Sequence, residues 1–185
     1  MTLARGCCAL MAATLLAACD TAQQPVEAST DSEAASAETI ELVPVTHAQW
    51  STTLADYQPN IVVVDMWATW CAPCVERFPK MVTLHERYAN KGVTIVGMSL
   101  EDRDDAGAVA GAADFLVRQR ARFPNFLMDE NILDSFDKLD ILGIPAVDIY
   151  DQRGKLRYRL TGDDPNNQFT DADIEEAIVS LLAET

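Results

Sequence analysis

The chain has 185 residues, and its 29 acidic and 14 basic side chains give a formal net charge of −15. This length suits one domain together with a processed or flexible leader. The acidic balance argues against nucleic acid as a partner and against attachment to anionic lipid headgroups by charge alone.

Residues 1–19 are expected to be an export signal. Arg5 is its positive flank, and residues 7–18 form a small apolar core that is too short to span a membrane. The core ends in Leu-Ala-Ala-Cys, which resembles the lipobox of bacterial lipoproteins. The resemblance implies that Cys19 receives a lipid and becomes the first residue after cleavage. An ordinary secretory signal, cut at the same Ala-rich site, is the alternative.

Residues 20–39 are expected to be a flexible linker. They are rich in Ala, Ser, Thr, Gln and Glu and have no apolar periodicity, which is typical of a spacer between an anchor and a domain. Asp20 resembles an inner-membrane retention signal of some Gram-negative bacteria. We therefore expect an exported domain, residues 40–185, that its lipid holds at the inner membrane and that faces the periplasm.

The first elements of this domain are a short strand and a helix. Residues 40–45 predict a strand, which Pro44 confines to the margin of a sheet because proline cannot donate to the ladder. Residues 46–56 predict a helix capped by Thr46, with Trp50 as a core anchor.

A buried strand and a pair of cysteines follow. Residues 61–64 form a continuous β-branched run, which predicts a strand covered on both faces. Cys71 and Cys74 come next, at the start of a helical pattern whose first turn accommodates Pro73. The positive end of that helix stabilises a Cys71 thiolate. Two cysteines at this spacing can close a small disulfide ring, and a reactive thiolate with a second thiol one turn away is what thiol–disulfide exchange needs.

Two other interpretations of this cysteine pair are a structural disulfide and half of a zinc site. Zinc usually takes four ligands, but the chain has no second CxxC motif, and His47 and His85 show no ligand spacing. We therefore expect no metal and no cofactor, with His85 on the surface. Cys7 and Cys8 lie in the leader and Cys19 would carry lipid, so the exported chain has no disulfide framework and the pair is expected to be catalytic.

The succession of strand, Trp70, CxxC and helix resembles the active site of the thioredoxin superfamily. The resemblance implies that Cys71 attacks a substrate disulfide and that Cys74 resolves the mixed disulfide. It also implies that Asp65, six residues before Cys71, is a buried carboxylate that exchanges a proton with Cys74. A buried acid with only a structural role is the alternative. Trp70 would shelter the pair and contact the partner.

The next segment predicts a second strand at residues 93–100 and a helix to about Ala121. The acidic run at residues 101–105 is expected to cap this helix and to be solvated, because negative charge is favoured at a helix start. A metal site is the less favoured alternative for the run. Burial is expected for four apolar side chains of the helix: Val109, Ala113, Leu116 and Val117.

Residues 123–129 lead into a short strand, and residues 132–139 predict a short helix. This block resembles the strand-and-helix insertion of the TlpA/ResA group of membrane-anchored bacterial thioredoxins, in which the insertion helps to shape the substrate groove. The AhpC/redoxin family shares this layout, but it relies on a peroxidatic cysteine in a different local motif that is absent here.

Gly143-Ile144-Pro145 resembles the loop of this superfamily in which a cis-proline faces the CxxC motif. The resemblance implies that Ile144 and Pro145, together with Ala72, Pro73 and Trp70, bind the extended backbone of a substrate. An ordinary turn proline is the alternative, since a cis bond cannot be derived from sequence alone.

Three positions depart from the family pattern. Ala146 replaces the usual Thr after the proline. Asp148 occupies a strand position that is generally apolar, as an edge or surface residue or as a second acidic group. Arg77 stands where the family typically keeps a Glu, which places a cation near the site and is expected to affect thiol acidity.

The chain ends in a hairpin and a helix. Residues 151–154 predict a turn, and residues 156–160 predict a half-exposed last strand. Residues 170–173 resemble a capping box that opens an amphipathic helix. Strands alternating with helices predict an α/β domain with a mixed central sheet covered on both faces. The resemblance implies a three-layer thioredoxin-like fold with a TlpA/ResA-type insertion.

The implied activity is that of a thiol–disulfide oxidoreductase that reduces exported protein disulfides, for example in apocytochrome c before haem attachment. Its partners would be protein substrates and an upstream thiol donor, with no nucleic acid. A tethered binding or metal-delivery module and a thiol peroxidase are the alternatives. Copper-handling relatives space their cysteines by three residues and add a distal histidine, whereas this chain has no histidine after His85.

Overall fold

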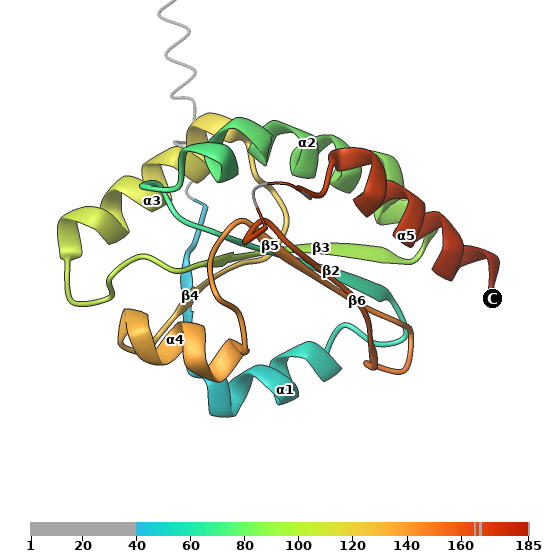
Figure 1. Cartoon of the computed structure of the whole chain (residues 1–185), viewed down its shortest axis with the longest axis horizontal. Helices are drawn as coiled ribbons and strands as arrows, with labels where there is room; N and C mark the ends of the chain where they lie inside the picture. Colours follow the sequence, from blue (N-terminus) through green and yellow to red (C-terminus); the bar gives the residue numbers. More distant parts are fainter. Residues whose placement is uncertain (1–39, 165, 167, 185) are drawn as a thin grey trace, which may run out of the picture. The chain divides into compact units, whose positions relative to one another are not determined.

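The computed structural model describes residues 40–164, 166 and 168–184, which form a six-stranded sheet with helices on both faces (Figure 1). The expected signal, the linker and the lipidated Cys19 lie outside the described residues. The strand order is β1-β4-β3-β2-β5-β6. The strands are β1 (Val43–Val45), β2 (Ile61–Trp67), β3 (Val93–Ser99), β4 (Asn125–Met128), β5 (Ala146–Tyr150) and β6 (Leu156–Thr161).

The sheet is mixed, as the sequence predicts. β1, β4, β3 and β2 are parallel neighbours, whereas β5 pairs antiparallel with β2 and β6 pairs antiparallel with β5. The carboxyl ends of β2, β3 and β4 and the start of β5 therefore meet at one edge of the sheet, here called the cysteine edge, because Cys71 follows β2 there.

Two layers of helices cover the sheet. α2 (Ala72–Tyr88), α3 (Ala106–Gln119) and α5 (Asp171–Ala183) lie on one face, and α1 (His47–Ala55) and α4 (Ile132–Leu139) lie on the other (Figure 1). The short 3-10 helix η1 (Ala89–Lys91) follows α2, and Gly92 ends it at a φ of 77°. In the described part of the chain, no helix is both long enough and apolar enough to cross a bilayer.

The predicted caps explain where three helices begin. Thr46 and Gln49 form a capping box at α1, and Thr170 and Asp173 form one at α5. Asp105 accepts hydrogen bonds from two backbone N–H groups of the first turn of α3. Each cap satisfies donors that the first turn of a helix leaves without partners.

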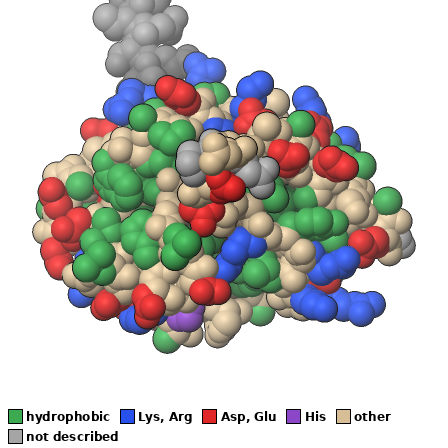
Figure 2. All heavy atoms as spheres, in the orientation of Figure 1, with side chains coloured by type: hydrophobic (Ala, Val, Ile, Leu, Met, Phe, Trp, Pro, Cys, Tyr) green, Lys and Arg blue, Asp and Glu red, His purple; other side chains and the backbone are tan. Residues whose placement is uncertain are grey.

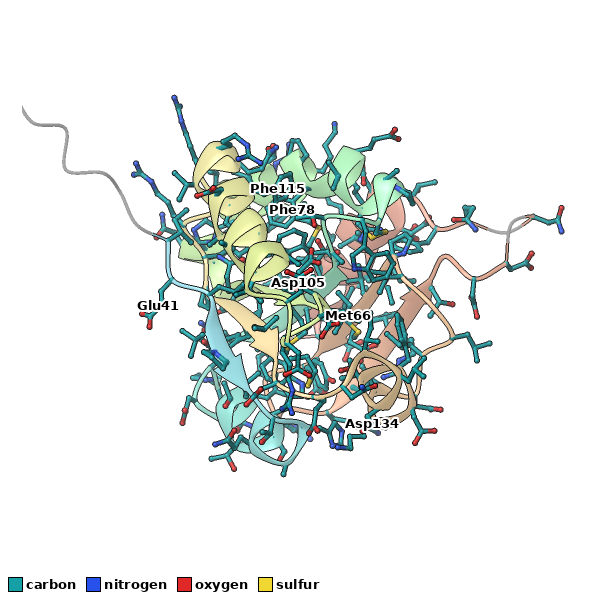
Figure 3. All side chains as sticks on the ribbon, turned by 90° about the vertical axis from the view of Figure 1, so that its left-hand side faces the viewer. Glu41, Met66, Phe78, Asp105, Phe115 and Asp134 are labelled. Atoms are coloured by element: carbon teal, nitrogen blue, oxygen red, sulfur yellow. A yellow bond between two sulfur atoms is a disulfide. The ribbon has the colours of Figure 1, made fainter. Side chains whose placement is uncertain are left out.

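All seven residues of β2 are buried, as the predicted cover on both faces requires. Its side chains alternate between two cores. Ile61, Val63 and Trp67 belong to the core under α2, α3 and α5. Val62, Val64 and Met66 belong to the core under α1 and α4. Figure 3 shows Phe78 and Phe115 on one side of the sheet and Met66 on the other.

Aromatic rings fill the first core. The ring of Phe78 lies 4.8 Å from that of Trp67 and 5.0 Å from that of Phe115, both measured between centroids and both in edge-on contacts. In the second core, Trp50 packs edge-on against Phe126 at 5.7 Å, which confirms its expected place as a core anchor.

The buried stripe of α3 differs from the prediction. Ala112, Phe115 and Leu116 are its buried residues, whereas Val117 is 41% exposed. Residues spaced by three and four share one helix face, so the stripe centred on Phe115 turns Val117 toward solvent. Val109 and Ala113 flank the stripe and are half-buried.

Candidate active site

The loop after β2 fixes Cys71 at the start of α2. The Cys71 N–H donates to the Ala68 carbonyl at 3.1 Å, and the Val75 N–H donates to the Cys71 carbonyl at 3.0 Å. Cys71 is the N-cap residue, and Pro73 lies in the first turn, as predicted. The Cys71 sulfur is thus held where the helix dipole favours negative charge.

Cys71 and Cys74 form the predicted disulfide, with their Cα atoms 5.3 Å apart. Cys74 is fully buried, whereas Cys71 keeps 5% of its surface exposed. Trp70, directly before the pair, is 53% exposed. An attacking group from outside therefore reaches Cys71 first, and Cys74 is protected by the core.

The predicted proline loop lies at the same edge. The Ile144–Pro145 peptide bond is cis, and a second cis bond, Gln58–Pro59, was not anticipated. Pro145 immediately precedes β5, whose first residue pairs with Met66 of β2. The loop therefore adjoins the end of the strand that leads to Cys71. The Gly162 N–H donates to the Pro145 carbonyl at 2.8 Å and ties the loop to the segment after β6.

Apolar side chains are exposed around this edge. Trp70 follows β2, Leu133 begins α4 after β4, and Leu142 precedes β5; their exposed fractions are 53%, 75% and 89%. Figure 2 shows hydrophobic side chains gathered between α3 and α4. These side chains are accessible to a partner that binds at the cysteine edge.

Asp65 is fully buried on β2. It alternates with Val63 and Trp67, so it faces the core that contains both cysteines. Its Oδ1 atom accepts a hydrogen bond from Arg77 Nη2 in an ion pair, and its Oδ2 atom has no hydrogen-bond partner among the described residues. Burial raises the pKa of Asp65, although the Arg77 guanidinium opposes this rise.

Arg77, the departure from the family pattern, is the direct partner of this acid. It lies one helical turn beyond Cys74, and its side chain is only 10% exposed. Its guanidinium also lies over the Phe169 ring, 4.6 Å from the centroid. Sequence reasoning placed a cation near the thiols, but it did not identify Asp65 as the group that the cation contacts.

Glu101 is a functional candidate that the sequence reasoning missed. The acidic run 101–105 was expected to be solvated, which is wrong for Glu101, because it is 3% exposed. Its carboxylate accepts the backbone N–H of Thr69, in the loop before Cys71. The available signal was its place two residues after the end of β3, at the cysteine edge. The remaining residues of the run are exposed, as predicted.

Asp148 is neither an edge residue nor a surface residue. It is 1% exposed, and Arg159 Nε and Nη2 each donate to one of its carboxylate oxygens at 2.7 Å. On β5, it is the direct neighbour of Val64 on β2, and the Val64 side chain belongs to the α1/α4 core. Asp148 therefore faces away from Asp65, and it is not a second acidic group of the cysteine site.

His85 was expected on the surface, but it is half-buried and packs edge-on against Phe123 at 5.6 Å. Burial lowers its pKa. No group of three or more His, Cys, Asp or Glu side chains within the described ranges is arranged to hold a metal ion.

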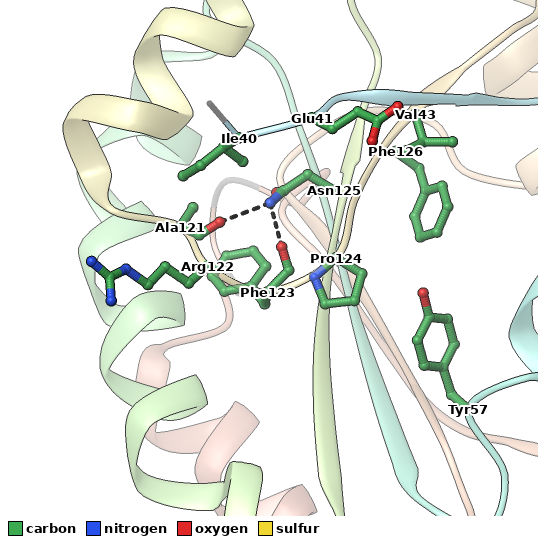
Figure 4. Close-up of a pocket in the computed structure, with 10 residues that line it drawn as sticks. All are labelled: Ile40, Glu41, Val43, Tyr57, Ala121, Arg122, Phe123, Pro124, Asn125 and Phe126. Carbon is green, nitrogen blue, oxygen red and sulfur yellow. Dashed lines mark hydrogen bonds between the residues drawn. The ribbon is translucent and has the colours of Figure 1, made fainter. Parts of the chain in front are cut away.

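A separate groove of about 560 Å³ lies beside β1 and β4 (Figure 4). Ile40, Tyr57, Phe123 and Phe126 are among its walls, and the Asn125 amide donates to two backbone carbonyls next to it. Neither cysteine contributes to this groove. The groove and the candidate active site are therefore distinct.

The fold and the cysteine edge together define a thioredoxin-like domain. The pattern of the Redoxin family matches residues 32–178. The chain therefore belongs to the Redoxin family, as a TlpA/ResA-like member of the thioredoxin superfamily. The absence of a local peroxidatic motif, which set the chain apart from AhpC/redoxin proteins, does not prevent a match over most of the domain.

Among curated relatives, thiol-disulfide oxidoreductase ResA of Bacillus subtilis (strain 168) is 27% identical over 110 residues, which cover 59% of this chain and 57% of the relative. ResA of Bacillus cereus (strain ATCC 10987 / NRS 248) is 26% identical and covers 62% of each chain. The chain thus spans about three fifths of the length of these relatives.

Solved structures share the fold. A proposed thiol:disulfide interchange protein DsbE from Chlorobium tepidum aligns with a TM-score of 0.56 and 26% identity, over 70% of this chain and 84% of that chain. A thiol-disulfide isomerase from Corynebacterium glutamicum aligns with a TM-score of 0.59 and 20% identity, over 81% and 99%. The predicted thioredoxin-like α/β fold is confirmed.

Proposed function

We propose that this chain is a thiol–disulfide oxidoreductase that acts on protein disulfides through Cys71 and Cys74, chiefly as a reductant. One observation carries the proposal: a disulfide at the start of α2 joins a slightly exposed Cys71 to a fully buried Cys74. The names of the ResA relatives support the same activity.

The reaction starts from the dithiol form. The Cys71 thiolate attacks one sulfur of a substrate disulfide, and the other substrate sulfur leaves as a thiolate. The Cys74 thiolate then attacks Cys71, releases the second substrate thiol and forms the intramolecular disulfide. The substrate gains two electrons, and an upstream dithiol returns two electrons to the chain. Asp65 takes the proton of Cys74 before the second attack.

The substrate binds along the cysteine edge. Trp70 contacts the partner, and Ala72 and Pro73 are exposed beside the disulfide. Ile144 and Pro145 complete the groove for an extended backbone. The exposed apolar side chains at this edge support a polypeptide as the substrate.

The reaction takes place outside the cytoplasm. Residues 1–19 direct export, Cys19 carries a lipid at the inner membrane, and residues 20–39 separate the anchor from the domain at 40–185. Apocytochrome c is an example of the exported substrates. The lipobox resemblance supports this location, and incorporation of labelled palmitate tests it. Labelling is expected in the wild-type chain and absent in Cys19→Ser; unlabelled wild-type chain excludes the anchor.

Two variants test the catalytic assignment. Cys71→Ser is expected to abolish reduction of a protein disulfide, because the accessible nucleophile is gone. Cys74→Ser is expected to accumulate mixed disulfides with substrates, since nothing resolves them. Wild-type rates in both variants would contradict the proposal.

The reduction potential of the pair tests the direction of electron flow. A value near about −270 mV, as in thioredoxin, supports a reductant, whereas a value near about −120 mV, as in DsbA, makes the chain an oxidant. No titratable disulfide at all favours a binding module. The match to the Redoxin family makes peroxide consumption with a thiol donor the second activity to measure.

A further inference from the structure

Arg77 joins the cysteine helix to the buried acid beneath it. It follows Cys74 by three positions on α2, and residues so spaced lie on one face of a helix. Its Nη2 atom donates to Asp65 Oδ1. The same guanidinium covers the Phe169 ring. The side chain is therefore held between two groups that are far from it in sequence.

Asp65 and the cysteines share one core. Asp65 lies between Val63 and Trp67 on the face of β2 that packs against α2, and these two neighbours cluster with Cys71 and Cys74. Because Arg77 holds Oδ1, the second oxygen, Oδ2, is left buried without a hydrogen-bond partner among the described residues. Asp65 Oδ2 can therefore accept a hydrogen bond or a proton beneath the first turns of α2.

The charges around Asp65 come from two helices. Arg77 faces it from α2, and Asp171, the first residue of α5, acts on it with the opposite sign. Its direct partners across the sheet, Gly97 of β3 and Val147 of β5, are uncharged. A carboxylate buried without a cation takes up a proton, because burial disfavours its charged form. Arg77 is the group here that favours the charged form.

We propose that Arg77 is a positioning residue for disulfide exchange: it favours the charged form of Asp65, leaves Oδ2 free, and thereby sets the pH above which Cys74 can be deprotonated. This inference rests on the proposed function, since only a resolving Cys74 has a proton to give. In the step, the Cys74 S–H bond breaks and the proton moves to Asp65. The thiolate attacks Cys71, and the electron pair of the broken mixed disulfide leaves with the substrate sulfur.

An arginine suits this position for two physical reasons. Its guanidinium carries several N–H donors in one plane, so one nitrogen can hold Oδ1 while the cation stays beside the acid. It also lies over the Phe169 ring, where the cation interacts with the π-system. A lysine would keep the charge but lose the planar hydrogen-bonding geometry.

The first experiment measures the protonation of Asp65 directly. The chain is labelled with ¹³C at aspartate carboxyl carbons, the Asp65 signal is assigned with Asp65→Asn, and its midpoint is followed by NMR. In Arg77→Met, the midpoint is expected to rise by at least about one pH unit, because a close opposite charge is lost. Arg77→Lys is expected to raise it less. Arg153→Met, in the turn at the far end of the sheet, is the matched charge control and is expected to cause no shift.

The second experiment measures the rate of mixed-disulfide resolution against pH. The profile of Arg77→Met is expected to move to higher pH by the same amount as the Asp65 midpoint; each unit means a tenfold lower ionised fraction below the midpoint. In the Asp65→Asn background, Arg77→Met is expected to leave the profile unchanged. A purely structural role would lower the rate at every pH and leave the profile in place.

The outcomes separate the two proposals. If the chain performs no exchange, the proposed function fails, while the NMR titration still decides whether Arg77 controls the charge of Asp65. If exchange occurs and Arg77→Met shifts neither the midpoint nor the profile, the Arg77 proposal alone is overturned. If Arg77→Met does not fold, Arg77→Lys decides in the same assays, and an unshifted midpoint there overturns the proposal.

Discussion

Each face of the sheet carries an ion pair between an aspartate and an arginine. The two pairs differ in how many of their polar atoms form hydrogen bonds. On the α1/α4 face, Asp148 accepts hydrogen bonds from Arg159 Nε and Nη2, both at 2.7 Å. It also accepts one from the Tyr150 hydroxyl at 3.3 Å. Arg159 Nη1 also donates to the Asp140 carbonyl at 2.9 Å. On the α2 face, Arg77 contacts Asp65 through one nitrogen.

The difference lies in the atoms without partners. Asp65 Oδ2 and Arg77 Nε are both buried without a hydrogen bond among the described residues, whereas the atoms of the Asp148–Arg159 pair are satisfied. A buried polar atom without a partner costs about 1–3 kcal/mol. Such a cost is tolerated where the free atom takes part in chemistry. The complete pair is thus expected to serve stability, and the incomplete pair to serve proton transfer.

Replacing Arg159, the cation of the fully hydrogen-bonded pair, is expected to have the largest effect on stability. Arg159→Met leaves Asp148 buried and unpaired, which should lower the free energy of unfolding by about 3–5 kcal/mol. Urea unfolding measures the loss. The double variant Asp148→Leu/Arg159→Met is the control, because it removes both charges and should recover most of the stability. If Arg159→Met instead changes the pH profile of exchange, the assignment of this pair to stability is contradicted.

Replacing Glu101 at the cysteine edge is expected to have an intermediate effect on stability. Glu101→Ala leaves the Thr69 N–H without its acceptor, which should lower the free energy of unfolding by about 1–3 kcal/mol. The loop before Cys71 should also become less ordered, so alkylation of the reduced Cys71 is expected to change. Glu101→Gln keeps an acceptor oxygen and is the matched control. Identical alkylation rates in Glu101→Ala and wild type would show that this contact does not position the loop.

Asp65 is expected to make the free energy of unfolding depend on pH. Its pKa in the folded chain lies above the ordinary value of 3.8, so the fold prefers the protonated acid. Stability from this group is fully present below about pH 4 and is lost as the pH rises through the folded pKa. Asp65→Asn should remove this slope, which amounts to up to about 1.4 kcal/mol per pH unit within that window. Urea unfolding between pH 4 and 8 measures the difference. Parallel stability curves would contradict the raised pKa.

The smallest expected effect is that of His85, a titratable group in the last turn of α2 and outside the site. Burial lowers its pKa from 6.5, so its contribution to stability is present above that pH and is lost as the pH falls through the folded value. His85→Gln should change the free energy of unfolding by under about 0.5 kcal/mol, as partly exposed substitutions usually do. Its exchange profile should match wild type; a shifted profile would place His85 in the site.

Local signals in the sequence were sufficient for the elements and for the cysteine pair. The β-branched run at 61–64 predicts β2 because burial on both faces requires it. The caps at Thr46 and Thr170 act within one helical turn, and the spacing of Cys71 and Cys74 depends only on the helix that follows. None of these predictions depends on where distant segments lie.

The ion pairs could not be predicted in the same way, because they depend on tertiary placement. Asp65 and Arg77 are 12 residues apart, on a strand and on the helix that returns over it. The other pair was closer to prediction. Asp148 and Arg159 are direct neighbours across the β5–β6 hairpin. The hairpin limits the partner of Asp148 to a few residues of β6, but the ladder is irregular between Ile149 and Tyr150, so counting back from the predicted turn does not give Arg159 by itself.

The two outer strands have a consequence for how the domain meets other chains. β1 has three residues, and its Pro44 offers no N–H for pairing. β6 carries Arg157, and the ladder between β5 and β6 is irregular at Ile149 and Tyr150. Short, interrupted and charged outer strands resist aggregation by strand addition. We therefore expect an extended polypeptide with exposed cysteines to meet this domain through its chemistry at the cysteine edge and not to nucleate fibrils along its sides.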